Sequence, residues 1–380
     1  MNLKEMRMGI HKNIAVIEGD GIGPEVTRQS VKVLNAIAEQ FGHDFSYRYC
    51  LLGADAIDKT GIPLPPETIN ICMQSDAILF GAIGHPKYDN DPAAKIRPEQ
   101  GLLGLRKTLQ LYANIRPVST FTSLHHLSPL KSQHIKGVDF IIFRELTGGL
   151  YFGKKETNAE QTVASDDCVY TKEEIIRIAH LAFKAAQKRK KKLTLVDKAN
   201  VLETSRLWRK VLKEMAILYP DVQLDFLYVD NAAMQIILNP RQFDVIVTEN
   251  MFGDILSDEA SVITGSLGLL PSASIGNKTA LFEPIHGSYP QATGKDIANP
   301  IGSILSAALL LDHFGLHVES ALVREAVKWT LKNGFVTKDI EPVNFYFTST
   351  IGDLISDYIG NKIPGRVNME NIELRKSTII

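Results

Sequence analysis

Two carboxylates stand four residues apart in the segment FGDILSD, at Asp254 and Asp258. They follow a short apolar, β-branched run, 243–248, which predicts a buried strand. Helical spacing would place both carboxylates on one face, where like charges repel and destabilise the helix. Binding of a hard cation, Mg²⁺ or Mn²⁺, through carboxylate oxygens would offset that repulsion. The alternative is that Asp254 caps the helix and Asp258 is solvated, and the pair alone leaves both interpretations open.

A tyrosine and a lysine stand where they could move protons. Tyr151 follows the turn at 147–149, and Lys198 follows the strand-like run LTLV. In a polar cleft the two side chains could exchange protons with a hydroxyl or an enolate, provided that neighbours lower their pKa values toward neutrality. Without such neighbours, a packed tyrosine and an exposed lysine explain the same sequence.

Arginines near the ends of expected elements form the next group of candidates: Arg97, Arg106, Arg116 and Arg144. Guanidinium groups bind carboxylates through two parallel hydrogen bonds, so several arginines in one cleft would suit a di- or tricarboxylate substrate. Each arginine by itself is equally compatible with a surface ion pair.

Two loops invite comparison with nucleotide sites. The segment GDGIGPE, 19–25, resembles the dinucleotide fingerprint GxGxxG, but Pro24 replaces the third glycine. Because proline suits the first turn of a helix, we expect a tight strand-to-helix turn here rather than a pyrophosphate site. His286, in LFEPIHGSYP, could bind adenine and ribose with Glu283, although a single loop histidine is commonly structural.

Short apolar runs alternate with longer amphipathic segments, which predicts an α/β protein with a largely parallel, two-sided sheet and catalytic groups at the carboxyl ends of its strands. The expected strands are 13–17, 77–83, 138–145, 193–197 and 243–250, and the expected helices are 25–40, 172–190, 203–218 and 254–264. A length of 380 residues favours two domains, or one large unit with an insertion.

Composition excludes several classes of protein. A net charge of -1 argues against a broad nucleic-acid surface, and the basic run 188–192 is explained as a solvated helix end. The cysteines at 50, 72 and 168 lack metal-site spacing and indicate neither zinc nor a disulfide framework, which favours a reducing cytoplasm. No apolar window approaches ~18 residues, and no signal peptide is evident, so we expect no membrane span.

Taken in order, the motifs GDGIGPE, LLGLRK, RELTGGLYFG, VDKANVL, YVDN, FGDILSDEAS, GSLGLLPSAS, EPIHGS and GKDIANP resemble the 3-isopropylmalate dehydrogenases, within the isocitrate/isopropylmalate family of metal-dependent β-decarboxylating dehydrogenases. The resemblance runs from about Asn13 to beyond Asp353. It implies NAD-dependent oxidative decarboxylation of (2R,3S)-3-isopropylmalate to 2-oxoisocaproate in leucine biosynthesis.

The fold implied by the resemblance is a two-domain α/β architecture with mixed sheets flanked by helices, and not a Rossmann fold. Residues 1–111 and 265–380 would form a large domain with most of the NAD site. Residues 112–264 would form a second domain with the metal ligands and the interface of a homodimer that shares its active sites.

The resemblance also implies roles for individual residues. The divalent ion would be held by Asp230, Asp254 and Asp258, against the C2 hydroxyl and its adjacent carboxylate. Lys198, assisted by Asp230 and presented with it across the dimer interface, would take the hydroxyl proton, and Tyr151 would return a proton to the enol carbon. The malate carboxylates would be held by Arg106, Arg116 and Arg144. The cofactor residues would be Glu99 at the nicotinamide end and Glu283, His286, Gly287, Ser288, Gln291 and Asn299.

Two positions bear on specificity. Leu102 and Leu103 offer an apolar surface suited to an isopropyl group, where isocitrate would need a polar or cationic partner. Many relatives have an aspartate where this chain has Gln291, and a neutral amide removes the charge that repels the 2′-phosphate of NADP. We expect NAD, since no cation is offered in its place, and NADP stays an alternative.

Three other functions stay open: an isocitrate or homoisocitrate dehydrogenase, a tartrate or alkylmalate dehydrogenase, and a non-catalytic subunit of the same fold. The presence of the tyrosine, the lysine and the three aspartates favours a working enzyme.

Overall fold

The computed structural model describes residues 9–89 and 96–361, and within it the chain forms two compact units. The first unit comprises 1–109, 266–273 and 278–380, and the second comprises 110–265 and 274–277. Among the described helices, none has the length and apolar character that crossing a membrane requires.

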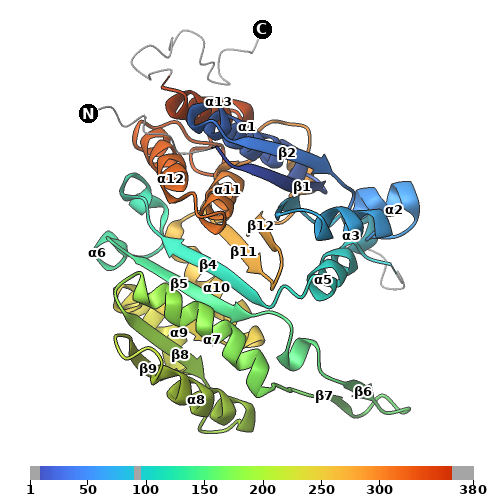
Figure 1. The fold of residues 1–380 in the computed structure, drawn as a ribbon, viewed down its shortest axis with the longest axis vertical. Helices are drawn as coiled ribbons and strands as arrows, with labels where there is room; N and C mark the ends of the chain where they lie inside the picture. The colour runs from blue at the N-terminus through green and yellow to red at the C-terminus, as the bar shows by residue number, and fades with distance from the viewer. Residues whose placement is uncertain (1–8, 90–95, 362–380) are drawn as a thin grey trace. The chain divides into compact units, whose positions relative to one another are not determined.

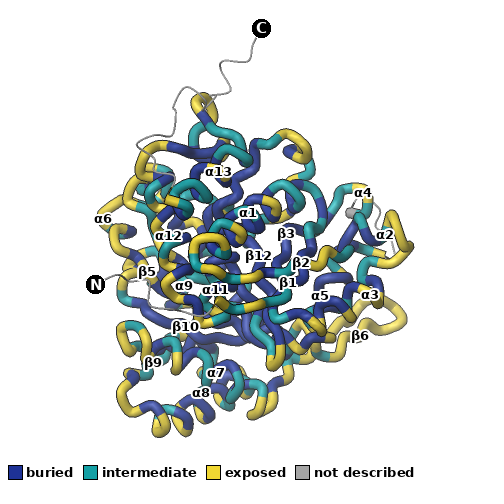
Figure 2. Tube along the Cα trace, turned by 45° about the horizontal axis from the view of Figure 1, so that its top comes forward, coloured by how far each residue is buried: buried dark blue, intermediate teal, exposed yellow. Residues whose placement is uncertain are grey.

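The first unit contains a sheet in which four strands pair in parallel (Figure 1). Its strand order is β2 (Asp44–Tyr49), β1 (His11–Gly19), β3 (Ala77–Ala82), β12 (Ala280–Pro284) and then β11 (Pro271–Ile275), which runs on into the second unit. The run Ile14 to Ile17 in β1 is inaccessible to solvent at every residue, and Figure 2 shows the same burial in β3 and β12. Continuous burial of this kind is typical of a parallel strand covered on both faces.

Helices before and after these strands complete the first unit. They are α1 (Gly23–Phe41), α2 (Ala54–Thr60), α3 (Pro66–Met73), α4 (Pro86–Asp89), α5 (Pro98–Thr108), α11 (Ile301–His313), α12 (His317–Lys332) and α13 (Thr348–Ile359). The helix α1 packs against both α11 and α13. Because α11 is apolar nearly all round, it is a buried core helix rather than a surface one.

The second unit has a mixed sheet in the order β4 (Ala113–Ser119), β5 (Asp139–Glu145), β10 (Val245–Thr248), β8 (Lys192–Asp197) and β9 (Gln223–Tyr228). The strand β4 runs antiparallel to β5, and the other neighbours are parallel. A separate antiparallel pair, β6 (Lys155–Thr157) and β7 (Ala164–Asp166), is exposed at every residue.

Helices cover both faces of this second sheet (Figure 1). One face packs against α7 (Lys172–Gln187) and α8 (Glu203–Ala216), and the other against α9 (Val229–Leu238) and α10 (Asn250–Ser261), while the short α6 (Ser132–Ile135) precedes β5. Strand β10 shows the two-residue period: Val245 and Val247 join the first core, and Ile246 joins the second. The sheet thereby carries two hydrophobic cores, one on each face.

The expected elements are present with small shifts at their ends, and one interpretation is wrong. The helix predicted to begin at Asp254 begins at Asn250, with Glu249 as its N-cap, whose carboxylate accepts a hydrogen bond from the Phe252 amide at 3.1 Å. Asp254 therefore lies inside the helix and does not cap it. The largely parallel sheet that we expected is mixed in the second unit, because β4 is antiparallel.

The glycine-rich segment forms the tight turn that we expected. Gly19 and Gly21 have φ values of 71° and 60°, in the left-handed region that favours glycine. A Cβ on Gly21 would lie 2.0 Å from the Ser288 carbonyl oxygen, and the Ile22 amide donates to that oxygen at 2.8 Å. The turn therefore packs backbone to backbone against the segment that carries His286.

The basic run 188–192 follows the end of α7 and is balanced by nearby carboxylates. Arg189 forms ion pairs of 2.8 Å with both Asp139 and Asp244. These contacts agree with the interpretation of the run as a helix end in solvent and give no reason to assign it a nucleic acid.

Candidate active site

The acidic pair lies on α10 in the second unit, and each carboxylate has an arginine as its neighbour. Asp254 forms an ion pair with Arg144 of β5, and Asp258 forms one of 2.8 Å with Arg116 of β4. The predicted i,i+4 placement on one helix is therefore present. Two guanidinium groups relieve the repulsion between the carboxylates in the structure as it stands.

Arg144 is held by Asn250, at the start of the same helix. The Asn250 Oδ1 accepts hydrogen bonds from Nε and Nη2 of Arg144 at 3.0 and 2.8 Å. Gly253 is required beside this arginine, because a Cβ there would lie 2.6 Å from the Arg144 Cγ. The arginine is buried and oriented before any ligand binds.

Arg116 is oriented in the same way by two polar neighbours. Its Nε donates to the Asn114 Oδ1 at 2.9 Å, and its Nη1 donates to the Ser257 Oγ at 2.8 Å. Sequence reasoning missed Asn114, Ser257 and Asn250. A usable signal existed: Asn114 lies two residues before Arg116 on one face of a strand, and Asn250 lies one helical turn before Asp254.

Tyr151 joins the same cluster from the 3₁₀ turn Gly149–Tyr151. Its hydroxyl donates to the Asp254 Oδ2 at 2.9 Å, and the Arg144 guanidinium carbon lies 5.7 Å from the ring centroid. Burial, and then the Asp254 carboxylate, raise the pKa of the Tyr151 hydroxyl. The condition that neighbours lower this pKa toward neutrality is therefore not met. The phenol stays protonated near neutral pH and can act as a proton donor.

Lys198 and Asp230 form a second pair in the same unit. Lys198 directly follows the carboxyl end of β8, and Asp230 lies in the first turn of α9 after β9. Their charged groups lie 2.8 Å apart, and the hydrogen bond from Lys198 lowers the pKa of the Asp230 carboxyl. Within residues 9–89 and 96–361, no three acidic, histidine or cysteine side chains are grouped closely enough to hold a metal ion. The structure of one chain thus brings Asp254 and Asp258 together but does not add Asp230 to them.

The first unit holds Arg106, the third arginine expected to bind the substrate. Arg106, on α5, forms an ion pair of 2.7 Å with Glu283 of β12, which joins a predicted substrate residue to a predicted cofactor residue. The Nε of Arg106 is buried and has no hydrogen-bond partner within the described chain. On the same helix Leu102 is 8% exposed and Leu103 is 50% exposed. The two leucines therefore differ: Leu102 belongs to the core of the unit, and only Leu103 presents its side chain outward.

The loop around His286 has features that a nucleotide could use. The His286 Nδ1 lies 3.0 Å from the Gly287 carbonyl oxygen, while its buried Nε2 has no hydrogen-bond partner among the described residues. Burial lowers the pKa of the imidazole, which favours the neutral ring. If Nδ1 carries the proton, Nε2 is a hydrogen-bond acceptor without a donor. The amino group of adenine could supply that donor. A Cβ on Gly287 would meet nothing within 4 Å, so space is open beside it.

The other predicted cofactor residues lie in the same unit. Ser288 is buried, and its carbonyl accepts from Ile22 as described above, whereas Gln291, in the 3₁₀ turn Pro290–Ala292, is exposed. Asn299 donates to Asp339 at 3.1 Å and accepts from the Ile301 amide at 3.0 Å, so it has a structural role at the start of α11. Glu99 lies in the first turn of α5, and a Cβ on Gly84 would lie 3.0 Å from its Oε1.

Comparison with protein families gives a match to isocitrate/isopropylmalate dehydrogenase over residues 13–355. The chain belongs to this family. The predicted family and enzyme class, an oxidoreductase, are confirmed, and with them the mixed α/β fold.

Sequence similarity to individual proteins supports the same family. The chain is 55% identical over 348 residues to a 3-isopropylmalate dehydrogenase of Bacteroides fragilis, which covers 91% of this chain and 98% of that protein. It is 53% identical over 353 residues to the 3-isopropylmalate dehydrogenase of Carboxydothermus hydrogenoformans, covering 91% and 94%.

Solved structures of this family resemble the chain in fold. An isocitrate dehydrogenase from Methylococcus capsulatus superposes with a TM-score of 0.81 at 34% identity, covering 92% of this chain and 99% of that one. A β-decarboxylating dehydrogenase from Thermococcus kodakarensis, in its apo form, gives a TM-score of 0.78 at 37% identity, covering 92% and 96%.

Proposed function

We propose that the chain is an NAD-dependent 3-isopropylmalate dehydrogenase that oxidises and decarboxylates (2R,3S)-3-isopropylmalate to 2-oxoisocaproate, a step of leucine biosynthesis. The observation that carries the proposal is the cluster on α10: two carboxylates, two oriented arginines and a tyrosine with a raised pKa. The names of the relatives point to the same reaction. The free cysteines of the described chain favour a reducing compartment, and we propose the cytoplasm.

The residues present fit a divalent ion such as Mg²⁺ or Mn²⁺. Asp254 and Asp258 offer carboxylate oxygens, the ligands that such hard cations prefer. Their side chains are 34% and 69% exposed, so both are accessible to an ion. The bonds that they now make to arginine and tyrosine would be exchanged for bonds to the ion and substrate. When bound, the ion would polarise the substrate's hydroxyl and carboxylate, and NAD would accept the hydride.

The chain's own side chains supply binding and proton transfer. Arg116 and Arg144, already oriented by asparagines, would bind substrate carboxylates through paired hydrogen bonds, together with Arg106. Lys198, with Asp230 as its neighbour, would take the proton of the substrate hydroxyl. Tyr151, protonated near neutral pH, would donate a proton to the enol carbon. The side chain of Leu103 would meet the isopropyl group.

We also propose a homodimer in which Lys198 and Asp230 serve the active site of the partner. Exposed apolar residues lie in line with the acidic ones: Met234 and Leu238 follow Asp230 at four-residue intervals on α9. Ile255 on α10 and Val262, the C-cap of that helix, flank Asp258 at helical spacing. These four side chains are 46–61% exposed, and burying them against a second copy would be favourable. The third carboxylate ligand would then come from the partner's Asp230.

In this proposal the second unit carries the dimer interface and the metal ligands, and the first unit carries most of the NAD site. The buried, unsatisfied Nε2 of His286 and the open space at Gly287 fit an adenine. Gln291 is neutral and exposed, so it offers no cation to attract the 2′-phosphate of NADP, and NAD is the expected cofactor. Because it also offers no negative charge to repel that phosphate, we expect the preference for NAD over NADP to be modest.

The test of function is a spectrophotometric assay of NADH formation. We expect turnover of 3-isopropylmalate with NAD and Mg²⁺, loss of turnover with a chelator, and a lower kcat/KM for isocitrate, homoisocitrate and tartrate. A higher kcat/KM for isocitrate would reject the substrate assignment. Nucleotide binding without any turnover would favour a non-catalytic subunit.

The test of the shared site is complementation between two inactive variants, Lys198→Ala and Tyr151→Phe. Half of randomly mixed dimers contain both variants, and each of these has one site with an intact lysine and tyrosine, so about a quarter of the wild-type activity should return. Co-refolded mixtures that stay inactive would show that each chain uses its own Lys198. Each variant mixed only with itself is the control.

A further inference from the structure

Two of the three cysteines meet in the first unit, although nothing in their sequence spacing marks them as a pair. Cys50 directly follows β2, and Cys72 lies near the end of α3. Each thiol is the neighbour that most strongly influences the pKa of the other, so the two side chains lie next to each other. The Thr68 hydroxyl donates to the Leu51 carbonyl at 2.6 Å and so fixes α3 against the segment that carries Cys50.

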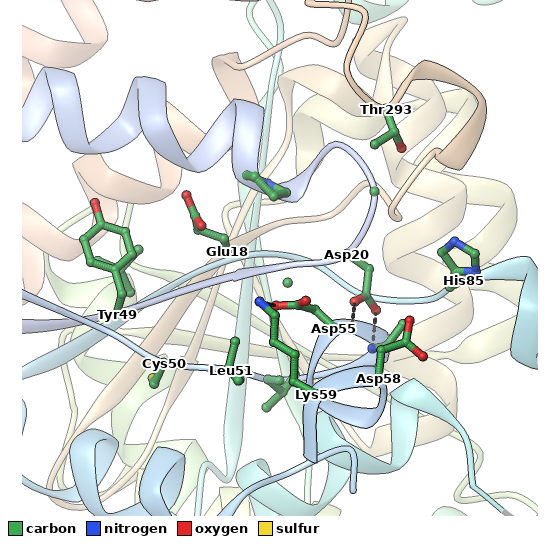
Figure 3. Close-up of a pocket in the computed structure, with 16 residues that line it drawn as sticks. Glu18, Asp20, Tyr49, Cys50, Leu51, Asp55, Asp58, Lys59, His85 and Thr293 are labelled. Carbon is green, nitrogen blue, oxygen red and sulfur yellow. Dashed lines mark hydrogen bonds and ion pairs between the residues drawn. The ribbon is translucent and has the colours of Figure 1, made fainter. Parts of the chain in front are cut away.

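The two thiols differ in their access to solvent. Cys72 is fully buried, whereas Cys50 is partly exposed and lines a cavity of about 550 Å³ that opens to solvent. Figure 3 shows Cys50 among the residues that line this cavity, with Glu18, Asp20 and Lys59. A small polar molecule can therefore approach Cys50 from this cavity, whereas Cys72 is closed to solvent.

Their electrostatics differ in the same direction. The hydrogen bond from Cys72 lowers the pKa of the Cys50 thiol, and the nearby Arg48 charge adds to this, against burial and Glu67. The same contact, with burial, raises the pKa of the Cys72 thiol. Of the two thiols, the accessible Cys50 therefore ionises more readily, and the thiolate is the reactive form of cysteine.

We propose that Cys50 and Cys72 form a peroxide-reactive dithiol site in which Cys50 is the attacking thiol and Cys72 the resolving thiol. The Cys50 thiolate attacks one oxygen of hydrogen peroxide, the O–O bond breaks, and hydroxide leaves and takes a proton to form water. Cys50 becomes a sulfenic acid.

The Cys72 sulfur then attacks the Cys50 sulfur, and the S–O bond breaks. The hydroxide that leaves takes the Cys72 proton and forms a second molecule of water. In sum, two thiols and one hydrogen peroxide give one disulfide and two waters: both sulfurs are oxidised and the peroxide is reduced.

Cys168 provides a matched control within the chain. It is partly exposed like Cys50, but it lies in the second unit, and burial raises its pKa. If exposure alone governed oxidation, Cys168 and Cys50 would react alike. The proposal requires that Cys50 react first.

The experiment treats the full-length protein with hydrogen peroxide and follows intact mass and peptide maps without a reductant. The wild type and Cys168→Ser should each lose two hydrogen atoms and yield a Cys50–Cys72 linked peptide. Cys72→Ser should instead accumulate a Cys50 sulfenic acid that dimedone traps. Cys50→Ser should react at least about tenfold more slowly than the wild type.

Thermal unfolding and dehydrogenase activity of each variant before oxidation establish that it is folded. The proposal is overturned if folded wild type keeps both thiols free, if Cys168 oxidises before Cys50, or if the products are disulfides between chains. It is also overturned if Cys50→Ser reacts as fast as the wild type.

Discussion

The two units treat their polar site residues in opposite ways. In the second unit each charged side chain of the α10 cluster has a protein partner, as in the pairs Arg144–Asp254 and Arg116–Asp258. In the first unit the buried Nε2 of His286 and the buried Nε of Arg106 lack hydrogen-bond partners among the residues that the structure describes. The α10 cluster keeps its charges paired, whereas His286 and Arg106 each keep one polar atom available.

For His286 this difference follows from the absence of charge, whereas Arg106 keeps an ion pair with Glu283 through Nη2 and leaves only its Nε without a partner. Leaving a charged group buried without a partner costs far more than leaving one neutral imidazole nitrogen unsatisfied, about 1–3 kcal/mol for the latter. Carboxylates and guanidiniums must therefore neutralise one another until a charged ligand replaces those bonds. A neutral nitrogen such as Nε2 of His286 can remain without a partner until its ligand binds.

The largest effect is expected from Asp254→Asn, which removes one of the two carboxylates on α10 and the charged partner of Arg144. Turnover should fall about 100- to 1,000-fold, because a pre-organised charge at the reacting centre is lost. The measurement is NADH formation across a Mg²⁺ titration. Asp225→Asn, at a surface pair with Lys192, is the matched control and should keep full activity. Equal activity of the two variants would contradict the role of Asp254.

A smaller effect is expected from Asn250→Ala, which takes away the acceptor of two hydrogen bonds from Arg144. The KM for isopropylmalate should rise about tenfold or more, since an unsatisfied donor pair costs about 1–3 kcal/mol. Steady-state kinetics separate this from a general loss of folding, because kcat should change less than KM. An unchanged KM would mean that Arg144 needs no support from Asn250.

For the first unit, His286→Ala should raise the KM for NAD about five- to tenfold with little change in kcat. The reason is that Nε2 is proposed to gain one hydrogen bond only when the nucleotide is bound, a contribution of about 1 kcal/mol. Kinetics at varied NAD and a direct fluorescence titration of NADH measure it. Wild-type affinity in both assays would exclude Nε2 as a nucleotide acceptor.

Gln291→Asp should shift cofactor preference toward NAD by a few fold, about 1 kcal/mol, through repulsion of the 2′-phosphate by an exposed carboxylate. The quantity to compare is the ratio of kcat/KM for NAD and for NADP in the two proteins. A wild-type ratio already as large as that of the variant would refute the proposed role of Gln291.

The smallest effect concerns pH and the buried cap of α10. Burial, and the nearby Glu145, raise the pKa of Glu249 above its ordinary value of 4.5. The native state therefore favours the protonated form, so this contribution to stability is complete below pH 4.5 and is lost as the pH rises through the raised pKa. Urea unfolding should show a weaker fall in stability over this range for Glu249→Gln. If Glu249→Gln lost stability with pH as steeply as the wild type, groups other than Glu249 would be responsible for that loss.

Local patterns in the sequence were sufficient for the elements that bury apolar faces. The continuous run Ile14–Ile17 predicted a covered strand, and it is one. Proline at position 24 correctly predicted a turn that starts a helix. The strand β4 was not predicted, because its sequence ANIRPVS is interrupted by polar residues and a proline and forms no apolar run.

By itself the sequence determined the family, the mixed α/β fold through that family, and the placement of Asp254 and Asp258 on one helix, because these depend on residue order and helical period. Only the tertiary structure decided which partners those residues take: arginines from two strands for the carboxylates, and a cysteine neighbour for Cys50. It also decided that Leu102 faces the core and Leu103 faces outward. The physical reason is that partners far apart in the chain are brought together by packing, which local spacing does not encode.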